Sequence, residues 1–149
     1  MGACQTSMTI KRLTGQWRLY SLTIIRLLDG DLGTTYLVIL NDAPYGSERS
    51  YNAMRLANAL AKVEGEAVRL FLMGDAASCA KAGQKVPEGY YNLGDMLKMA
   101  ARRKVEVAVC GTCMDARGIG DGELVEGAAR GTLAQLAEWT AYADKVLVF

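Results

Sequence analysis

The sequence predicts an α/β protein, a three-layer sandwich in which helices cover both faces of a mostly parallel sheet. Short apolar runs with the length of a buried strand recur along the chain, and segments with helical periodicity separate them. Glycine, proline and polar residues fill the connections. Strands that alternate with helices form parallel sheets with right-handed crossovers. We therefore expect reactive groups just beyond the carboxyl ends of the strands.

The first half of the regular region predicts two strands, a helix and a long loop. Residues 36–40 (Tyr-Leu-Val-Ile-Leu) form an apolar run that ends at Asn41, which is typical of a fully buried strand. Residues 47–62 carry an apolar stripe at helical spacing and are followed by a glycine stop. A second strand is expected over residues 68–73. The glycine-rich residues 74–91 then predict a long loop, and loops of this length are usually functional or mobile.

The second half predicts a helix, two strands and a broken helical region. Asn92 caps the helix, with an acidic residue three positions on. Residues 105–109 are expected to form the third strand and residues 145–149 the final one. Between them, residues 123–143 have helical character, with a break predicted near Gly131.

The chain divides into a regular domain over residues 34–149 and an N-terminal extension over residues 1–33. The extension contains apolar residues without a clean helical or alternating pattern, so its structure is uncertain. It could add a strand or helix, form a flexible arm or lie upstream of the natural start. Within the regular domain, Leu136 and Trp139 are expected to pack in the core or at a subunit contact.

The composition is that of a globular protein and excludes several classes. Of the 149 residues, 51% are apolar and 22% are charged, which suits one domain with a sizeable core. The net charge of +1 favours neither nucleic acid nor an anionic membrane as a partner. Because no long uninterrupted apolar run is present, we expect no membrane span, no secretory signal and a cytoplasmic location. The chain has no histidine, which excludes a Ser-His-Asp or Cys-His mechanism within one chain.

The strongest chemical feature is the pair Cys110-Gly-Thr-Cys113, directly after the third predicted strand. A close cysteine pair in a reducing compartment indicates redox chemistry, sulfur chemistry or a metal. The residues after Cys110 can turn into a short helix, and a thiol at a helix N-terminus is favoured as thiolate. Arg117 could add to this effect, whereas Asp115 would oppose it or serve as a cap.

Other readings of the pair stay open. A cysteine at a strand end is often only a small buried hydrophobe. A structural metal site needs four ligands, and without histidine or a second C-x-x-C motif we expect no metal. The motif resembles the Cys-Gly-Pro-Cys of thioredoxin, but that motif normally follows an early strand. The absence of proline and of a preceding tryptophan also counts against a thioredoxin-type dithiol.

Two loops lie at the edge of the predicted sheet that also carries the cysteine pair. The turn over residues 41–48 opens a helix, and its free backbone N–H groups could hold an anion, although a plain strand-to-helix turn explains it equally well. Residues 83–91 have the composition of a binding loop, and a solvated surface loop is equally compatible. The candidate binding or supporting residues in these loops are Asp42, Tyr45, Gly46, Glu48, Gln84 and Lys85.

Several segments resemble the YchN branch of the DsrE/DsrF-like proteins, in order along roughly three quarters of the chain. They are residues 43–48 (Ala-Pro-Tyr-Gly-Ser-Glu), 69–73 (Arg-Leu-Phe-Leu-Met), 83–85 (Gly-Gln-Lys), 88–89 (Glu-Gly), 110–113 (Cys-x-Thr-Cys), 117–119 (Arg-Gly-Ile) and 143–149 (Ala-Asp-Lys-Val-Leu-x-Phe). The resemblance implies a five-stranded DsrE-like fold that assembles into homo-oligomers. Hexamers are favoured, with a trimer or dimer as alternatives.

The resemblance also implies a role for the cysteines. Related sulfur-relay subunits accept sulfane sulfur on a cysteine as a persulfide and pass it from donor to acceptor proteins. Their relay cysteine falls at the end of the third strand, and the matching position here is Cys110. Cys113 belongs to the pattern of the branch and could resolve or protect the persulfide. Cys4 and Cys79 match no motif, and we expect no cofactor.

Three functions follow as expectations. The first is a sulfur carrier or sulfurtransferase that works through Cys110, which strand-end position and resemblance both favour. The second is a dithiol redox protein or sensor that uses Cys110 and Cys113. The third is a non-catalytic oligomeric binding protein with inert cysteines.

Overall fold

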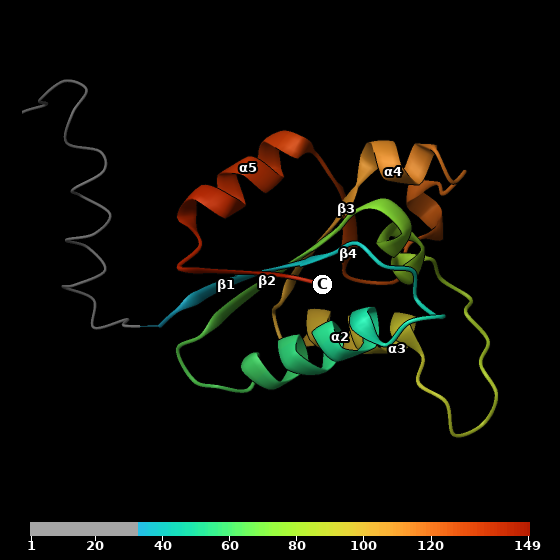
Figure 1. Cartoon of the computed structure of the whole chain (residues 1–149), viewed down its shortest axis with the longest axis horizontal. Helices are drawn as coiled ribbons and strands as arrows, with labels where there is room; N and C mark the ends of the chain where they lie inside the picture. The colour runs from blue at the N-terminus through green and yellow to red at the C-terminus, as the bar shows by residue number, and fades with distance from the viewer. Residues whose placement is uncertain (1–32) are drawn as a thin grey trace, which may run out of the picture. The chain divides into compact units, whose positions relative to one another are not determined.

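The fold is a five-stranded, all-parallel sheet with helices against both faces (Figure 1). The computed structural model describes residues 33–149; residues 1–32, with nearly all of the predicted extension and Cys4, lie outside the described residues. Across the sheet the strands follow the order β4 (Ala128–Gly131), β3 (Glu106–Cys110), β2 (Ala67–Leu72), β1 (Thr35–Leu40) and β5 (Lys145–Val148).

The helices complete the three layers that the sequence predicts. The two helices α2 (Arg49–Leu60) and α3 (Leu93–Arg102) cover one face of the sheet, and α5 (Leu133–Tyr142) covers the other (Figure 1). Two short elements follow strand ends directly: the 3₁₀ turn η1 (Gly74–Ala80) after β2, and the helix α4 (Gly111–Asp115) after β3. A second 3₁₀ turn, η2 (Asp121–Glu123), precedes β4.

One segment differs from the sequence prediction. Residues 123–143 do not form a broken helix: η2 ends there, the edge strand β4 follows, and only α5 is helical. The strand reads Ala-Ala-Arg-Gly, which has low strand propensity, so local sequence favours a helix there. Backbone pairing with β3 outweighs that preference, and Gly127, at φ +86°, turns the chain into the strand. The predicted loop over residues 74–91 also begins with η1.

Each face of the sheet carries its own hydrophobic cluster. On β2, Leu70 and Leu72 face the large cluster beneath α2 and α3, whereas Phe71 faces a smaller cluster beneath α5. In the smaller cluster Trp139 packs edge-on to Phe71, with ring centroids 6.1 Å apart. Leu136 and Trp139 are both buried, as the sequence predicts.

The predicted cap of α3 is confirmed, since the Asp95 N–H donates to the Asn92 side chain over 3.1 Å. Among the helices of residues 33–149, none combines the length and the apolarity that a membrane crossing requires.

Candidate functional site

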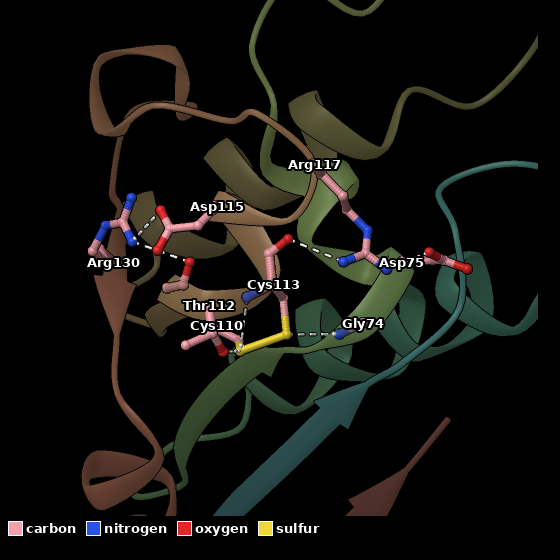
Figure 2. Close-up of a disulfide and its surroundings, with 9 residues drawn as sticks. Gly74, Asp75, Cys110, Thr112, Cys113, Asp115, Arg117 and Arg130 are labelled. Atoms are coloured by element: carbon pink, nitrogen blue, oxygen red, sulfur yellow. Dashed lines mark hydrogen bonds and ion pairs between the residues drawn. A yellow bond between two sulfur atoms is a disulfide. The ribbon is translucent and has the colours of Figure 1, made fainter.

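The cysteine pair lies where β3 ends and α4 begins (Figure 2). Cys110 is the last residue of the strand and the N-cap of α4, and Cys113 follows within the helix. The two Cα atoms are 5.2 Å apart, within the range that disulfides need, and the sulfur atoms are joined in a disulfide. The strand-end position and the short helix after it both agree with the sequence prediction.

Each sulfur atom accepts a hydrogen bond from a backbone N–H. The Gly74 N–H donates to Cys113 Sγ over 3.3 Å, and the Cys113 N–H donates to Cys110 Sγ over 3.4 Å (Figure 2). The Thr112 hydroxyl oxygen lies 3.3 Å from Cys110 Sγ. After reduction these donors would stabilise thiolates, because a charged acceptor strengthens a hydrogen bond. The surroundings of the pair therefore suit a reactive dithiol.

A pocket of about 490 Å³ opens beside Cys110. Its apolar walls come from Phe71 and Met73 at the end of β2 and from Leu133 at the start of α5. Cys110 itself is half-buried, so its sulfur is partly shielded from water and still reachable from the pocket. The polar side chains in the lining are Thr112, Asp115, Arg130 and Thr132.

Arg130 is a site residue that sequence reasoning missed. Its guanidinium pairs with Asp115 at 3.0 Å (Figure 2). It also donates to the Gly111 carbonyl over 3.0 Å and pairs with Asp121 at 2.6 Å. Hydrogen bonds to Asp121 and then Asp115 raise the pKa of Arg130. The predicted site residue Asp115 is thus charge-paired, and Arg130 ties α4 to the edge strand β4. The sequence does not indicate Arg130 as a site residue, because the segment that contains it is predicted to be helical and not a strand beside β3.

Arg117 braces α4 from the other side. Its guanidinium forms an ion pair with Asp75 in η1 and donates to the Cys113 carbonyl over 3.0 Å (Figure 2). The carboxylate of Asp75 balances its charge. The role that these contacts define is the attachment of α4 to η1, the turn that supplies the Gly74 N–H.

The two predicted binding loops contact each other. The Tyr45 hydroxyl donates to Gln84 Oε1 over 2.6 Å, and Gln84 Nε2 donates to the carbonyls of Cys79 and Lys81 over 2.8 and 2.9 Å. Burial raises the pKa of Tyr45. The Tyr45 ring also contacts Tyr91, at 5.7 Å between centroids. Tyr45 and Gln84 are therefore supporting residues that hold the loops together.

The remaining loop candidates lie outside the pocket lining. The Asp42 carboxylate accepts from the Ser47 hydroxyl over 2.8 Å, a contact within its own turn. Gly46, at φ +104°, allows that turn to close. Glu48 is the N-cap of α2 without a side-chain capping bond, and both Glu48 and Lys85 are exposed. The structure thus brings Cys110, Cys113 and Asp115 to one pocket and leaves these loop residues elsewhere.

Cys79 has the surroundings of a core residue. It is fully buried in the large hydrophobic cluster, and its Sγ contacts the Asp42 carbonyl oxygen at 3.7 Å. Burial raises the pKa of this thiol to about 12, so it stays protonated and unreactive at neutral pH.

The fold and the site together define a class: an α/β protein with a cysteine pair at the carboxyl edge of a parallel sheet, beside an apolar pocket. The sequence profile of the DsrE/DsrF-like family matches residues 34–149. The chain belongs to the DsrE/DsrF-like family.

Relatives extend this match over most of the chain. Protein YchN of Escherichia coli K12 is 47% identical over 114 residues, which cover 76% of this chain and 97% of YchN. An uncharacterised protein of Methanopyrus kandleri is 38% identical over 112 residues, covering 75% and 91%. The crystal structure of E. coli YchN superposes with a TM-score of 0.74 at 46% identity, covering 78% of this chain and 99% of that one. The predicted resemblance and fold are thereby confirmed.

Proposed function

We propose that the protein is a sulfur carrier that accepts sulfane sulfur on Cys110 as a persulfide and passes it to an acceptor protein. One observation carries the proposal: Cys110 is half-buried at the end of β3 and lines an apolar pocket beside it. A persulfide needs a nucleophilic thiolate to form and protection from bulk thiols to survive. The hydrogen bonds to the sulfur favour the first, and the pocket favours the second.

Mass spectrometry of the intact protein tests the carrier function. Reduced Cys113→Ser protein is incubated with inorganic polysulfide as the sulfane donor and then desalted. We expect one added sulfur atom, located on the peptide that contains Cys110 and removed by dithiothreitol. The matched control carries Cys110→Ser as well as Cys113→Ser, and the same peptide should gain no sulfur in it. A Cys113→Ser protein that stays unmodified at Cys110 would contradict the proposal.

A second function, a dithiol redox protein or sensor, is favoured by the disulfide between Cys110 and Cys113. It requires a reversible disulfide with a potential in the range of cellular thiols. Equilibration in dithiothreitol buffers of graded potential measures this directly. If sulfur transfer to an acceptor thiol persists in Cys113→Ser and is lost in Cys110→Ser, the result favours the carrier function over the redox function.

We also propose that the chain forms a homo-oligomer, with a hexamer favoured over a trimer or dimer. Three large apolar side chains are exposed on the α5 side of the sheet. Val146 and Val148 of the edge strand β5 are 40% and 61% exposed, and Leu133 at the start of α5 is 75% exposed. A second copy would bury them. Sedimentation analysis of the wild type and of Val148→Lys tests this: we expect a smaller species for the variant, and a monomeric wild type would refute it.

A further inference from the structure

The two cysteines of the site are placed to react with each other, and this adds a step to the proposed carrier chemistry. We propose that Cys113 discharges the Cys110 persulfide as hydrosulfide when no acceptor takes the sulfur. The inference rests on the proposed function, because it needs a persulfide on Cys110. It assigns the protein a further activity, the reduction of sulfane sulfur to sulfide.

The step balances without an external oxidant. The Cys113 thiolate attacks Cys110 Sγ, the inner sulfur of the persulfide, and forms the Cys110–Cys113 disulfide. The persulfide reacts in its protonated form, Cys110–S–SH: the bond between Cys110 Sγ and the outer sulfur breaks, and the outer sulfur keeps its proton and leaves with the electron pair as HS⁻. The sulfane sulfur is reduced by two electrons while the two cysteines are oxidised to the disulfide. A cellular thiol or dithiol reductant then returns the pair to its thiol state.

The backbone places Cys110 and Cys113 with their Cα atoms 5.2 Å apart, within the range that a disulfide between them requires. The disulfide is present with β3 and α4 both intact, so the product of the step is compatible with the fold. The Gly74 N–H donates to Cys113 Sγ and would stabilise the attacking thiolate. The ion pair between Arg117 and Asp75 fastens α4 to η1 and thereby keeps that donor in place.

The packing of the two side chains also indicates the direction of attack. Cys110 packs with the small cluster beneath α5, whereas Cys113 packs against the large cluster on the opposite face of the sheet. Cys113 thus approaches Cys110 Sγ from the side of the large cluster. Phe71 belongs to the small cluster, so an outer sulfur directed toward Phe71 would leave Cys110 Sγ on the side away from the large cluster.

The leaving group makes attack on the inner sulfur productive. Hydrosulfide is the conjugate base of a stronger acid than an alkyl thiol, and a leaving group of lower pKa departs faster. Because the nucleophile belongs to the same site, it acts at a high effective concentration. The persulfide lifetime is therefore a competition between the acceptor protein and Cys113.

The test follows sulfur and disulfide in the same samples. Reduced full-length wild type, Cys113→Ser and Cys4→Ser are loaded briefly with inorganic polysulfide and desalted. Released sulfide is trapped with monobromobimane, and intact mass and peptide maps are recorded over time. The Cys4→Ser control removes a thiol that is not part of the C-x-x-C pair.

We expect wild type and Cys4→Ser to release one sulfide for each disulfide formed between Cys110 and Cys113. In Cys113→Ser the persulfide should persist at least about a hundredfold longer, because the neighbouring nucleophile is gone. Equal lifetimes in wild type and Cys113→Ser would overturn the discharge step and leave the carrier function standing. Finding the added sulfur on Cys113 instead of Cys110 would overturn both the discharge step and the assignment of the persulfide to Cys110. If Cys113→Ser never gains sulfur at Cys110, the proposed carrier function itself fails.

Discussion

Alkaline pH should destabilise the protein through a single buried thiol, that of Cys79. Desolvation by burial raises its pKa from 9.0 to about 12 in the folded protein. In the unfolded chain the thiol ionises near pH 9, whereas the folded protein keeps it protonated up to about pH 12. The stabilisation that its burial provides is therefore complete below about pH 9 and is lost as the pH rises toward 12.

The size of the loss follows from these two pKa values. The linkage relation gives a decrease of about 1 kcal/mol in the free energy of unfolding between pH 8 and pH 10. The full shift corresponds to about 4 kcal/mol, reached only above pH 12. Such a loss is a large part of the stability of a typical domain.

Urea unfolding at pH 8 and pH 10 measures this contribution. The parent carries Cys110→Ser and Cys113→Ser, so that neither thiol of the pair contributes, and the test variant adds Cys79→Ala. Groups common to both proteins cancel in the difference between the two pH-induced changes. We expect the parent to lose about 1 kcal/mol more than the Cys79→Ala variant. Equal losses in both proteins would refute the reasoning, as would rapid alkylation of Cys79 in the folded parent at pH 8.

Two further predictions concern the edge strand and its approach. Gly127→Ala should lower the free energy of unfolding by about 2–4 kcal/mol, because φ is +86° and the new Cβ would lie 2.3 Å from the Cβ of Ala101. Gly118→Ala, at φ +62° with open space around it, should cost only about 1 kcal/mol in the same urea titration, and equal costs would argue against the steric reason. Arg130→Met should leave the unfolding midpoint almost unchanged, because exposed ion pairs contribute little. The same substitution should slow alkylation of reduced Cys110 severalfold, because the Asp115 carboxylate loses its positive partner and then disfavours a thiolate nearby. An unchanged alkylation rate would show that Arg130 does not influence the reactivity of Cys110.

Most strands and the reactive edge could be predicted from the sequence because their signals are local. The apolar run at residues 36–40, the Asn92 cap and the position of Cys110 after an apolar strand each depend on a few neighbouring residues. The strand β4 could not be predicted, since Ala-Ala-Arg-Gly becomes a strand only by pairing with β3.

The same limit applies to the charges around the site. The contacts of Arg130 with Gly111 and Asp115 join the strand β4 to the helix α4, which follows β3. These contacts form only when β4 lies beside β3. Likewise, the Gly74 N–H reaches Cys113 across 39 positions of sequence. No periodicity or motif contains that information, because the sheet order creates these contacts.

The edge-on contact between Phe71 and Trp139 links the pocket to tryptophan fluorescence. Phe71 forms a wall of the pocket, and its ring also packs against the indole. Filling or emptying the pocket therefore alters the environment of a buried fluorophore that the protein carries naturally. With Trp17, the other tryptophan of the chain, replaced by phenylalanine, emission from a single indole would follow pocket occupancy in real time without an attached dye.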